Sequence, residues 1–253
     1  MFSVRSLLSA TAAIALLAGI VPVASAASIK NVVLVHGAFA DGSGWKAVYD
    51  ILKHDGYSVS IVQEPETTLA DDVAATRRVL AQQSGPAILV GHSYGGAVIT
   101  GAGTDPKVAG LVYVAAFQPD VGESVAQLAT GTKAATNGAR PSADGFLFLD
   151  PTEFHADFAA DLPVAQTDLM ARSQVPVSVA AFTAPALDAA WKNKPSWAIV
   201  ATEDKAINPD LERSMYKRSN ATVTEIKSSH AVYISHAREV AKVIEQAAQH
   251  AAK

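Results

Sequence analysis

Residues 87–97 read AILVGHSYGGA, and this stretch decides the fold. Its first four residues are an apolar run that predicts a buried strand. A G-x-S-x-G motif follows directly, formed by Gly91, Ser93 and Gly95, and residues 93–103 then have a helix-like, small-residue pattern. Glycines at these positions avoid clashes across a very tight strand-to-helix turn that raises the serine hydroxyl at the end of a sheet. The alternative is a plain glycine turn that holds an incidental serine.

The rest of the chain alternates between short apolar runs and segments with helical spacing. Predicted strands cover residues 29–35, 57–62, 87–90, 110–115, 196–201 and 222–227, and predicted helices cover residues 43–55, 69–83, 93–103, 209–219 and 236–252. Parallel strands need long crossover connections, which helices supply. The alternation therefore predicts an α/β fold whose mostly parallel six-stranded sheet carries helices on both faces.

Residues 117–190 interrupt this alternation, because they lack strand-like runs and contain six prolines. We interpret the segment as an inserted helical lid, so that residues 27–253 form a single domain with a lid insertion at about 117–190. Some apolar side chains of the lid are expected to line a substrate pocket. The candidates are Phe117, Phe146, Phe148, Phe154, Phe158, Leu162, Met170 and Phe182.

The first 26 residues resemble no part of this pattern. Arg5 precedes an apolar run over residues 12–21, Pro22 ends the run, and small residues occupy positions 24–26. This three-part pattern is typical of a secretory signal peptide. The alternative is a membrane anchor, but the run is short against the roughly 20 residues needed to cross a bilayer. We expect cleavage near Ala27, export to the periplasm or the medium, and no stable membrane insertion afterwards.

The composition excludes several classes of protein. With 253 residues, 49% hydrophobic and 17% charged, the chain is not of a disordered type. Its formal net charge of −4 argues against a nucleic-acid partner. The absence of cysteine excludes a disulfide framework and a thiol nucleophile. The sequence has neither an H-E-x-x-H motif nor a complete dinucleotide fingerprint, so no metal and no cofactor are expected.

Four stretches carry a family resemblance. Residues 33–38 read VLVHGA, residues 91–96 read GHSYGG, residues 115–120 read AAFQPD and residues 200–207 read VATEDKAI. The first two resemble the α/β-hydrolase superfamily. The other two are similar to its branch of plant methyl-ester hydrolases, hydroxynitrile lyases and secreted bacterial esterases. The resemblance covers nearly all of the chain after residue 26, is weakest over residues 122–190, and implies the α/β-hydrolase fold with a Ser-His-Asp triad.

A serine nucleophile needs a base within hydrogen-bond reach. Two of the seven histidines remain as candidates after those in motif turns, at the end of a helix, in the lid and at the chain end are set aside. His230 lies in the loop after the last predicted strand, at the sheet end where sites form. His236 starts the final helix, with Ser235 as its N-cap. The loop position favours His230, and the resemblance identifies His230 as the catalytic histidine.

The histidine needs a carboxylate to orient it. The loop after the preceding strand offers Glu203 and Asp204. The resemblance assigns the acid to Asp204, with Asp120 as a less favoured candidate. A helix cap before residues 208–209 is the non-catalytic interpretation of Asp204. The order Ser93, Asp204, His230 agrees with the chain order of this fold.

Two backbone N–H groups are expected to form the oxyanion hole. One belongs to Tyr94, the residue after the nucleophile. By resemblance, the other belongs to Ala38, with Phe39 as the alternative.

Two departures from the family pattern bear on the reaction. Hydroxynitrile lyases of this branch place a lysine directly after the catalytic histidine and a threonine at the position of Gly37, whereas this chain has Ala231 and a glycine. A lyase is therefore disfavoured, and Ser93 excludes enzymes with an aspartate nucleophile. The sequence predicts an exported, cofactor-free serine hydrolase, a carboxylesterase for small-molecule esters that works through an acyl-enzyme. An amidase, lactonase or perhydrolase on the same triad, or a non-catalytic binding protein, are the alternatives.

Overall fold

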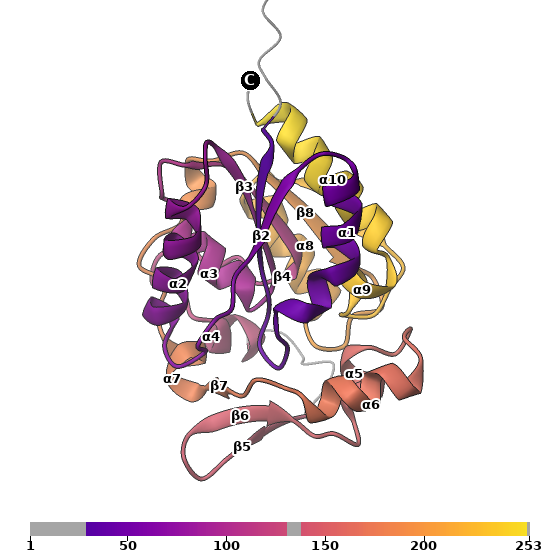
Figure 1. The fold of residues 1–253 in the computed structure, drawn as a ribbon. Coiled ribbons are helices and arrows are strands. Elements are labelled where there is room, and N and C mark those ends of the chain that lie inside the picture. Colours follow the sequence, from indigo (N-terminus) through magenta and orange to yellow (C-terminus); the bar gives the residue numbers. More distant parts are fainter. Residues whose placement is uncertain (1–28, 131–137, 252–253) are drawn as a thin grey trace, which may run out of the picture.

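The computed structural model describes residues 29–130 and 138–251, so the expected signal peptide lies outside the described residues. Six strands form a parallel central sheet in the order β2-β1-β3-β4-β8-β9 (Figure 1). Their bounds are β1 Asn31–Val35, β2 Ser58–Ile61, β3 Ala87–Ser93, β4 Val108–Ala116, β8 Ser196–Ala201 and β9 Thr222–Ile226. The predicted six-stranded parallel sheet is confirmed.

Helices cover both faces of the sheet because alternate side chains of each strand point to opposite sides. Val33 and Val35 of β1 pack into one core cluster with α2, α3 and α8, whereas Val32 and Leu34 pack into another with α1 and α10. The bounds are α1 Lys46–His54, α2 Leu69–Ala81, α3 Gly95–Ala102, α8 Pro209–Arg218, α9 Val232–Ser235, α10 Ala237–His250, and the 3-10 turns η1 Gly42–Trp45 and η2 Ala190–Lys192. No helix within the described ranges is both long and apolar enough to cross a membrane.

The inserted segment lies beyond the carboxyl ends of the strands (Figure 1). It contains the expected helices, α4 Val125–Thr130, α5 Phe154–Phe158, α6 Val164–Arg172 and α7 Val179–Thr183. It also contains a small antiparallel sheet that the sequence analysis did not predict, formed by β5 Ala139–Pro141, β6 Phe146–Leu149 and β7 Val177–Ser178. These strands have two to four residues, too few for an alternating pattern to stand out.

One helix boundary was predicted wrongly. The final helix begins at Ala237 rather than at His236, and Ser235 does not cap it. Ser235 instead ends α9, and its Oγ lies 3.0 Å from Nδ1 of His236. The backbone of His236, with a φ of −124° and a ψ of 41°, is not helical and separates α9 from α10. The sequence analysis places no helix over residues 232–235, so α9 is an additional element.

Candidate active site

Ser93 is the last residue of β3, and its backbone is left-handed, with a φ of 53°. A residue with a side chain holds this conformation only where the surrounding structure enforces it. Two glycines permit the turn. A Cβ on Gly91 would lie 2.5 Å from the carbonyl oxygen of Gly95, and a Cβ on Gly95 would lie 2.3 Å from that of His36. The strand, turn and helix therefore place Ser93 at the carboxyl end of the sheet, as the motif predicts.

Asp204 and His230 meet from the loops after β8 and β9. Nδ1 of His230 and Oδ2 of Asp204 are 2.6 Å apart, and both side chains are buried. The other carboxylate oxygen of Asp204 accepts the backbone N–H groups of Ala206 and Ile207 at 2.7 and 2.9 Å. The fixed carboxylate keeps the ring proton of His230 on Nδ1. Nε2 is then the unprotonated nitrogen, and among the described residues it has no hydrogen-bond partner although it is buried.

His92 joins the nucleophile turn to the histidine loop. Its Nε2 lies 3.0 Å from the carbonyl oxygen of His230, and the two imidazole rings are 4.6 Å apart between centroids. Burial lowers the pKa of His92 well below its ordinary value, so the ring is neutral and donates this bond from Nε2. The structure thus brings Asp204 and His230 together directly. His92, the residue before Ser93, contacts His230, whereas no described hydrogen bond joins Ser93 to His230.

The other candidate acids make different contacts. Glu203 and Asp120 each form an ion pair with a surface lysine. The N-cap of α8 is Asn208, whose side chain accepts the N–H group two residues later, so Asp204 does not cap that helix. The arrangement therefore favours Asp204 over the alternatives considered from the sequence.

A buried carboxyl that the sequence analysis missed lies behind this pair. Glu212 on α8 is fully buried, and its Oε2 accepts the backbone N–H of Ala201 at 3.3 Å. Burial, followed by the charge of Asp204, raises the pKa of Glu212 well above its ordinary value. Glu212 is therefore neutral, and Asp204 is the carboxyl group that faces His230. No sequence signal marks Glu212, because a glutamate in an amphipathic helix normally indicates its solvent-exposed face.

The loop after β1 packs directly against the nucleophile turn. A Cβ on Gly37 would lie 2.6 Å from Cβ of Ser93, and Ala38 is buried. The next residue, Phe39, has a φ of 65°, so the loop turns sharply away after Ala38. This close approach is what an oxyanion hole formed by this loop requires.

Tyr94, the other expected oxyanion donor, is anchored through its side chain. Its hydroxyl donates to Oδ2 of Asp72 at 2.7 Å, and Oδ1 of Asp72 accepts the backbone N–H of Glu66 at 2.8 Å. On its other side the Tyr94 ring stacks on Phe182 of the lid, with centroids 5.7 Å apart. A side chain held in this way also fixes the backbone N–H that the same residue presents.

One group of side chains within the described ranges has the spacing of a metal site, namely His36, Glu64 and Glu66, all buried. Nδ1 of His36 lies 3.7 Å from Glu64 and 3.6 Å from Glu66. However, Nε2 of His36 accepts the backbone N–H of Glu64 at 3.1 Å, so the ring proton sits on Nδ1. Nδ1 then faces the carbonyl oxygen of Gly37 at 3.1 Å. A protonated nitrogen cannot ligate a metal ion, so this histidine is a hydrogen-bond partner that holds two loops together.

The carboxyls of Glu64 and Glu66 are neutral acids at pH 7. Burial and then the nearby Asp72 raise the pKa of Glu66 to about 9, and the same two causes raise the pKa of Glu64 well above its ordinary value. An unfolded glutamate has its ordinary pKa of 4.5. Between pH 4.5 and about 9 the folded state therefore binds more protons than the unfolded state, and stability falls as the pH rises through this window.

We expect Glu66→Gln to stabilise the protein at alkaline pH, because glutamine keeps the shape of the neutral acid without its ionisation. The gain is expected to be small at pH 5 and to grow toward pH 8, by up to about 1.4 kcal/mol per pH unit. Thermal unfolding of both proteins at these two pH values measures it. A gain that did not depend on pH would contradict the assignment of a neutral buried acid.

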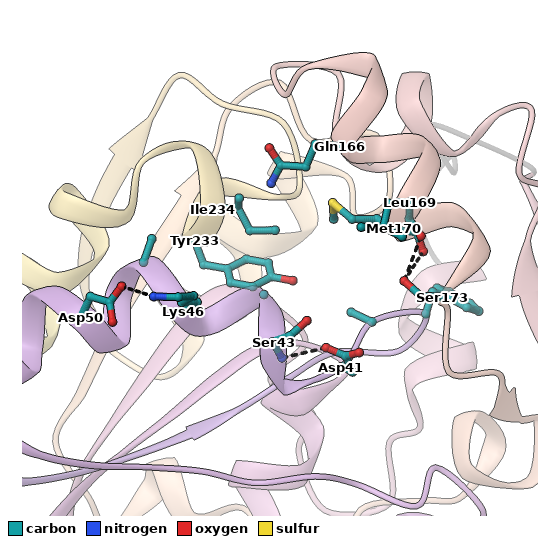
Figure 2. A pocket seen from close by; sticks show the side chains of 14 residues that line it. Asp41, Ser43, Lys46, Asp50, Gln166, Leu169, Met170, Ser173, Tyr233 and Ile234 are labelled. Carbon is teal, nitrogen blue, oxygen red and sulfur yellow. Dashed lines mark hydrogen bonds and ion pairs between the residues drawn. The ribbon is translucent and has the colours of Figure 1, made fainter.

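A cavity of about 410 Å³ lies between the lid and the loop after β1 (Figure 2). Its apolar lining includes Phe39, Ala40, Leu169, Met170, Tyr233 and Ile234. Tyr233 lies beside this space (Figure 2), and its hydroxyl is packed against Gly44, buried and with no hydrogen-bond partner among the described residues. The Tyr233 ring packs on His92, with centroids 4.2 Å apart, so this cavity is separated from the candidate catalytic residues by Tyr233 and His92. Ser93 and His230 do not line the cavity.

The lid phenylalanines pack on the site residues. Phe158 meets the ring of His230 edge-on, with centroids 4.8 Å apart, and Phe154 stacks behind Phe158 at 4.9 Å. Of the lid side chains expected to line a pocket, Met170 lines the cavity between α6 and α1. The aromatic lid side chains therefore shield the catalytic candidates from water.

Comparisons with known proteins agree with this geometry. The model of the family described as "Alpha/beta hydrolase family" matches residues 32–243. The pyrethroid hydrolase of Sphingobium wenxiniae is 27% identical over 250 residues, which cover 86% of this chain and 87% of that enzyme. The carbendazim hydrolyzing esterase of a Nocardioides species is 36% identical over 114 residues, 40% of this chain and 47% of that esterase.

Solved structures of other proteins share this fold. The crystal structure of polyneuridine aldehyde esterase superimposes with a TM-score of 0.76 at 21% identity, over 86% of this chain and 98% of that one. At this identity the likeness shows the fold.

Proposed function

Because the chain belongs to the α/β hydrolase family, we propose that it is an exported serine hydrolase that cleaves small carboxylic esters. Family membership and the two relatives named as a hydrolase and an esterase support esterase activity. The observation that carries the mechanism is the 2.6 Å hydrogen bond between the buried His230 and Asp204. It lies at the same end of the sheet as Ser93, whose φ of 53° is typical of a strained nucleophile turn.

In the proposed mechanism, the Ser93 hydroxyl oxygen attacks the ester carbonyl while Nε2 of His230 takes its proton. Asp204 holds the Nδ1 proton and stabilises the positive charge that forms on the ring. His230 then gives its proton to the leaving alcohol, and the acyl group remains on Ser93. A water molecule that loses its proton to His230 attacks this acyl-enzyme and releases the acid and the free serine.

The negative oxygen of each tetrahedral intermediate is proposed to be held by the backbone N–H groups of Ala38 and Tyr94. The support is the close packing of the loop after β1 against Ser93 and the anchoring of Tyr94 by Asp72. Fixed N–H dipoles in a site shielded from water stabilise developing charge strongly, because they need no reorganisation during the reaction.

Export is part of the proposal and is supported by the pattern of residues 1–26. Cleavage near Ala27 would leave only two residues before the first described residue, Ile29, so the whole catalytic fold would belong to the exported chain.

The residue after the proposed catalytic histidine argues against a hydroxynitrile lyase. Ala231 is fully buried, and its backbone N–H donates to the carbonyl oxygen of Phe158 at 3.1 Å. A lysine there would have to place its charge in this buried contact, which is costly without a partner. The position therefore offers no cation to a leaving cyanide.

The ester assignment is tested with a matched set of acyl compounds. We expect a short-chain p-nitrophenyl ester to be hydrolysed, and the p-nitroanilide of the same acid to be hydrolysed far more slowly, because p-nitroaniline leaves less readily than p-nitrophenolate. A lactone, and peroxide in place of water, complete the set. Preference for the anilide, the lactone or peroxide would replace the esterase by an amidase, lactonase or perhydrolase on the same triad.

A further inference from the structure

A short segment of the lid forms hydrogen bonds with the loop that carries His230. This segment, residues 158–161, begins at the last residue of α5, and the loop, residues 228–231, lies between β9 and α9. Oδ2 of Asp161 accepts the Ser228 hydroxyl at 2.8 Å and the backbone N–H of Ser229 at 3.1 Å. Oδ1 of Asp161 accepts the Ser229 hydroxyl. One lid carboxylate thus binds both residues that precede the histidine.

The same lid segment also holds the residue after His230. The backbone N–H of Ala231 donates to the carbonyl oxygen of Phe158 at 3.1 Å, and the Phe158 ring packs edge-on against His230. The lid therefore contacts the loop on both sides of the imidazole and on the imidazole itself.

The core holds this loop through its carbonyl groups. The carbonyl oxygen of Ser228 accepts the backbone N–H of Glu203 at 3.0 Å, and that of His230 meets His92 at 3.0 Å. The N–H groups of Ser229 and Ala231 go to the lid instead. Without the lid acceptors, the backbone N–H and the hydroxyl of the buried Ser229 would lose the partners described here, which buried polar groups rarely tolerate. The Ser228 hydroxyl would keep its contacts within the loop and with Ser235, and the N–H of Ala231 would keep only a 3.3 Å contact with Oγ of Ser229.

Asp161 accepts these bonds as an anion. The hydrogen bonds from Ser229 and Ser228 hold the pKa of Asp161 below its ordinary value, against the opposing effect of partial burial. Hydrogen bonds to a charged acceptor are stronger than those between neutral groups. The contact can therefore orient the loop even though Asp161 itself is exposed at the edge of the lid.

We propose that Asp161 is a positioning residue that fixes His230 for proton transfer, so that the base is correctly aimed only when the lid is docked. This inference rests on the proposed function, in which His230 is the base. Asp161 does not touch the reacting atoms and acts through Ser228 and Ser229. A small misplacement of a catalytic group lowers the rate strongly, and we expect a loss of about 10- to 100-fold in kcat.

The test compares Asp161→Ala and Asp161→Asn with the matched control Asp168→Asn. Asp168 is also an exposed lid carboxylate, but its partner is Arg172 on the same helix, at 3.1 Å. We expect both Asp161 variants to lower kcat with little change in KM and to alter the pH dependence of kcat. Asp161→Glu is expected to restore part of the loss, and Asp168→Asn to behave like the wild type.

A second readout does not depend on turnover. In protein labelled with ¹⁵N-histidine, the far-downfield proton resonance of the His230–Asp204 hydrogen bond reports the orientation of the ring. We expect this resonance to shift or broaden in Asp161→Ala and to be unchanged in Asp168→Asn. If the ester activity itself is absent, this resonance still tests the positioning role.

Two results would overturn the proposal. One is an Asp161→Ala variant with wild-type kcat and an unchanged resonance. The other is a variant that unfolds at a lower temperature but, below that temperature, retains full kcat and the wild-type resonance, which would leave Asp161 with a purely structural role in docking the lid.

Discussion

Replacing Ser93 by alanine is expected to lower kcat for a short-chain p-nitrophenyl ester by about 10³- to 10⁶-fold, by comparison with other triads. The substitution removes the oxygen that is proposed to attack the ester. The fold should survive, because alanine keeps the backbone of the turn and removes one oxygen.

Ser219→Ala is the matched control, since the hydroxyl of Ser219 bonds only the carbonyl of Tyr216 at the end of α8 among the described contacts. Steady-state kinetics with both variants measures the effect. A Ser93→Ala protein that keeps a tenth or more of wild-type turnover would mean that another group performs the attack.

The second large effect is expected from Asp204→Asn, with a loss of about 10³- to 10⁴-fold in kcat. Asparagine can still accept the N–H groups of Ala206 and Ile207 through its oxygen, so the loop should remain folded. Its NH₂ group would then face Nδ1 of His230 and favour the ring form whose proton is on Nε2. That nitrogen could no longer take the proton of Ser93.

Glu203→Gln and Asp120→Asn are the controls, because these carboxylates pair with surface lysines. Exposed pairs of this kind contribute little, so turnover should stay near that of the wild type. If Asp204→Asn were active and one of the controls were not, the acid of the triad would have to be reassigned to that residue.

The nucleophile turn could be predicted from sequence because its determinants are local. The apolar run over residues 87–90, the serine and the flanking glycines lie within ten residues. Gly91 is required by a backbone contact within the turn, and Gly95 by the backbone of His36 in the neighbouring loop. Asp204 and His230 are separated by 26 residues in the sequence. Their pairing was predicted from the family resemblance, because the loop that contains Asp204 also offers Glu203 as a candidate acid.

Contacts between residues that are far apart in the sequence leave no recognisable motif. Asp161 lies 68 residues before Ser229, and in the sequence it is one of many charged residues of a surface segment. The spacing of His36 and Glu64 does not resemble a metal motif, because 28 residues separate them and two loops bring them together.

The small lid sheet was missed for two physical reasons. Pro141 argues against a strand, but β5 is an edge strand, where a missing N–H is tolerated. The Asp144–Gly145 pair is typical of a hairpin turn, and Gly145 adopts a φ of 86°. However, the two flanking strands are too short to show an alternating pattern in the sequence, so the hairpin was not predicted.

Covalent labelling followed by intact-mass spectrometry tests the central claim most directly. Purified protein starting near Ala27 is treated with a p-nitrophenyl phosphonate, and the labelled peptide is located after digestion. Because phosphorus is attacked by an activated serine, the account predicts one adduct per chain on Ser93, none in Ser93→Ala, and greatly slowed labelling in His230→Ala. A folded wild-type protein that remains unlabelled, or an adduct on another residue, would contradict the assignment of Ser93 as the nucleophile.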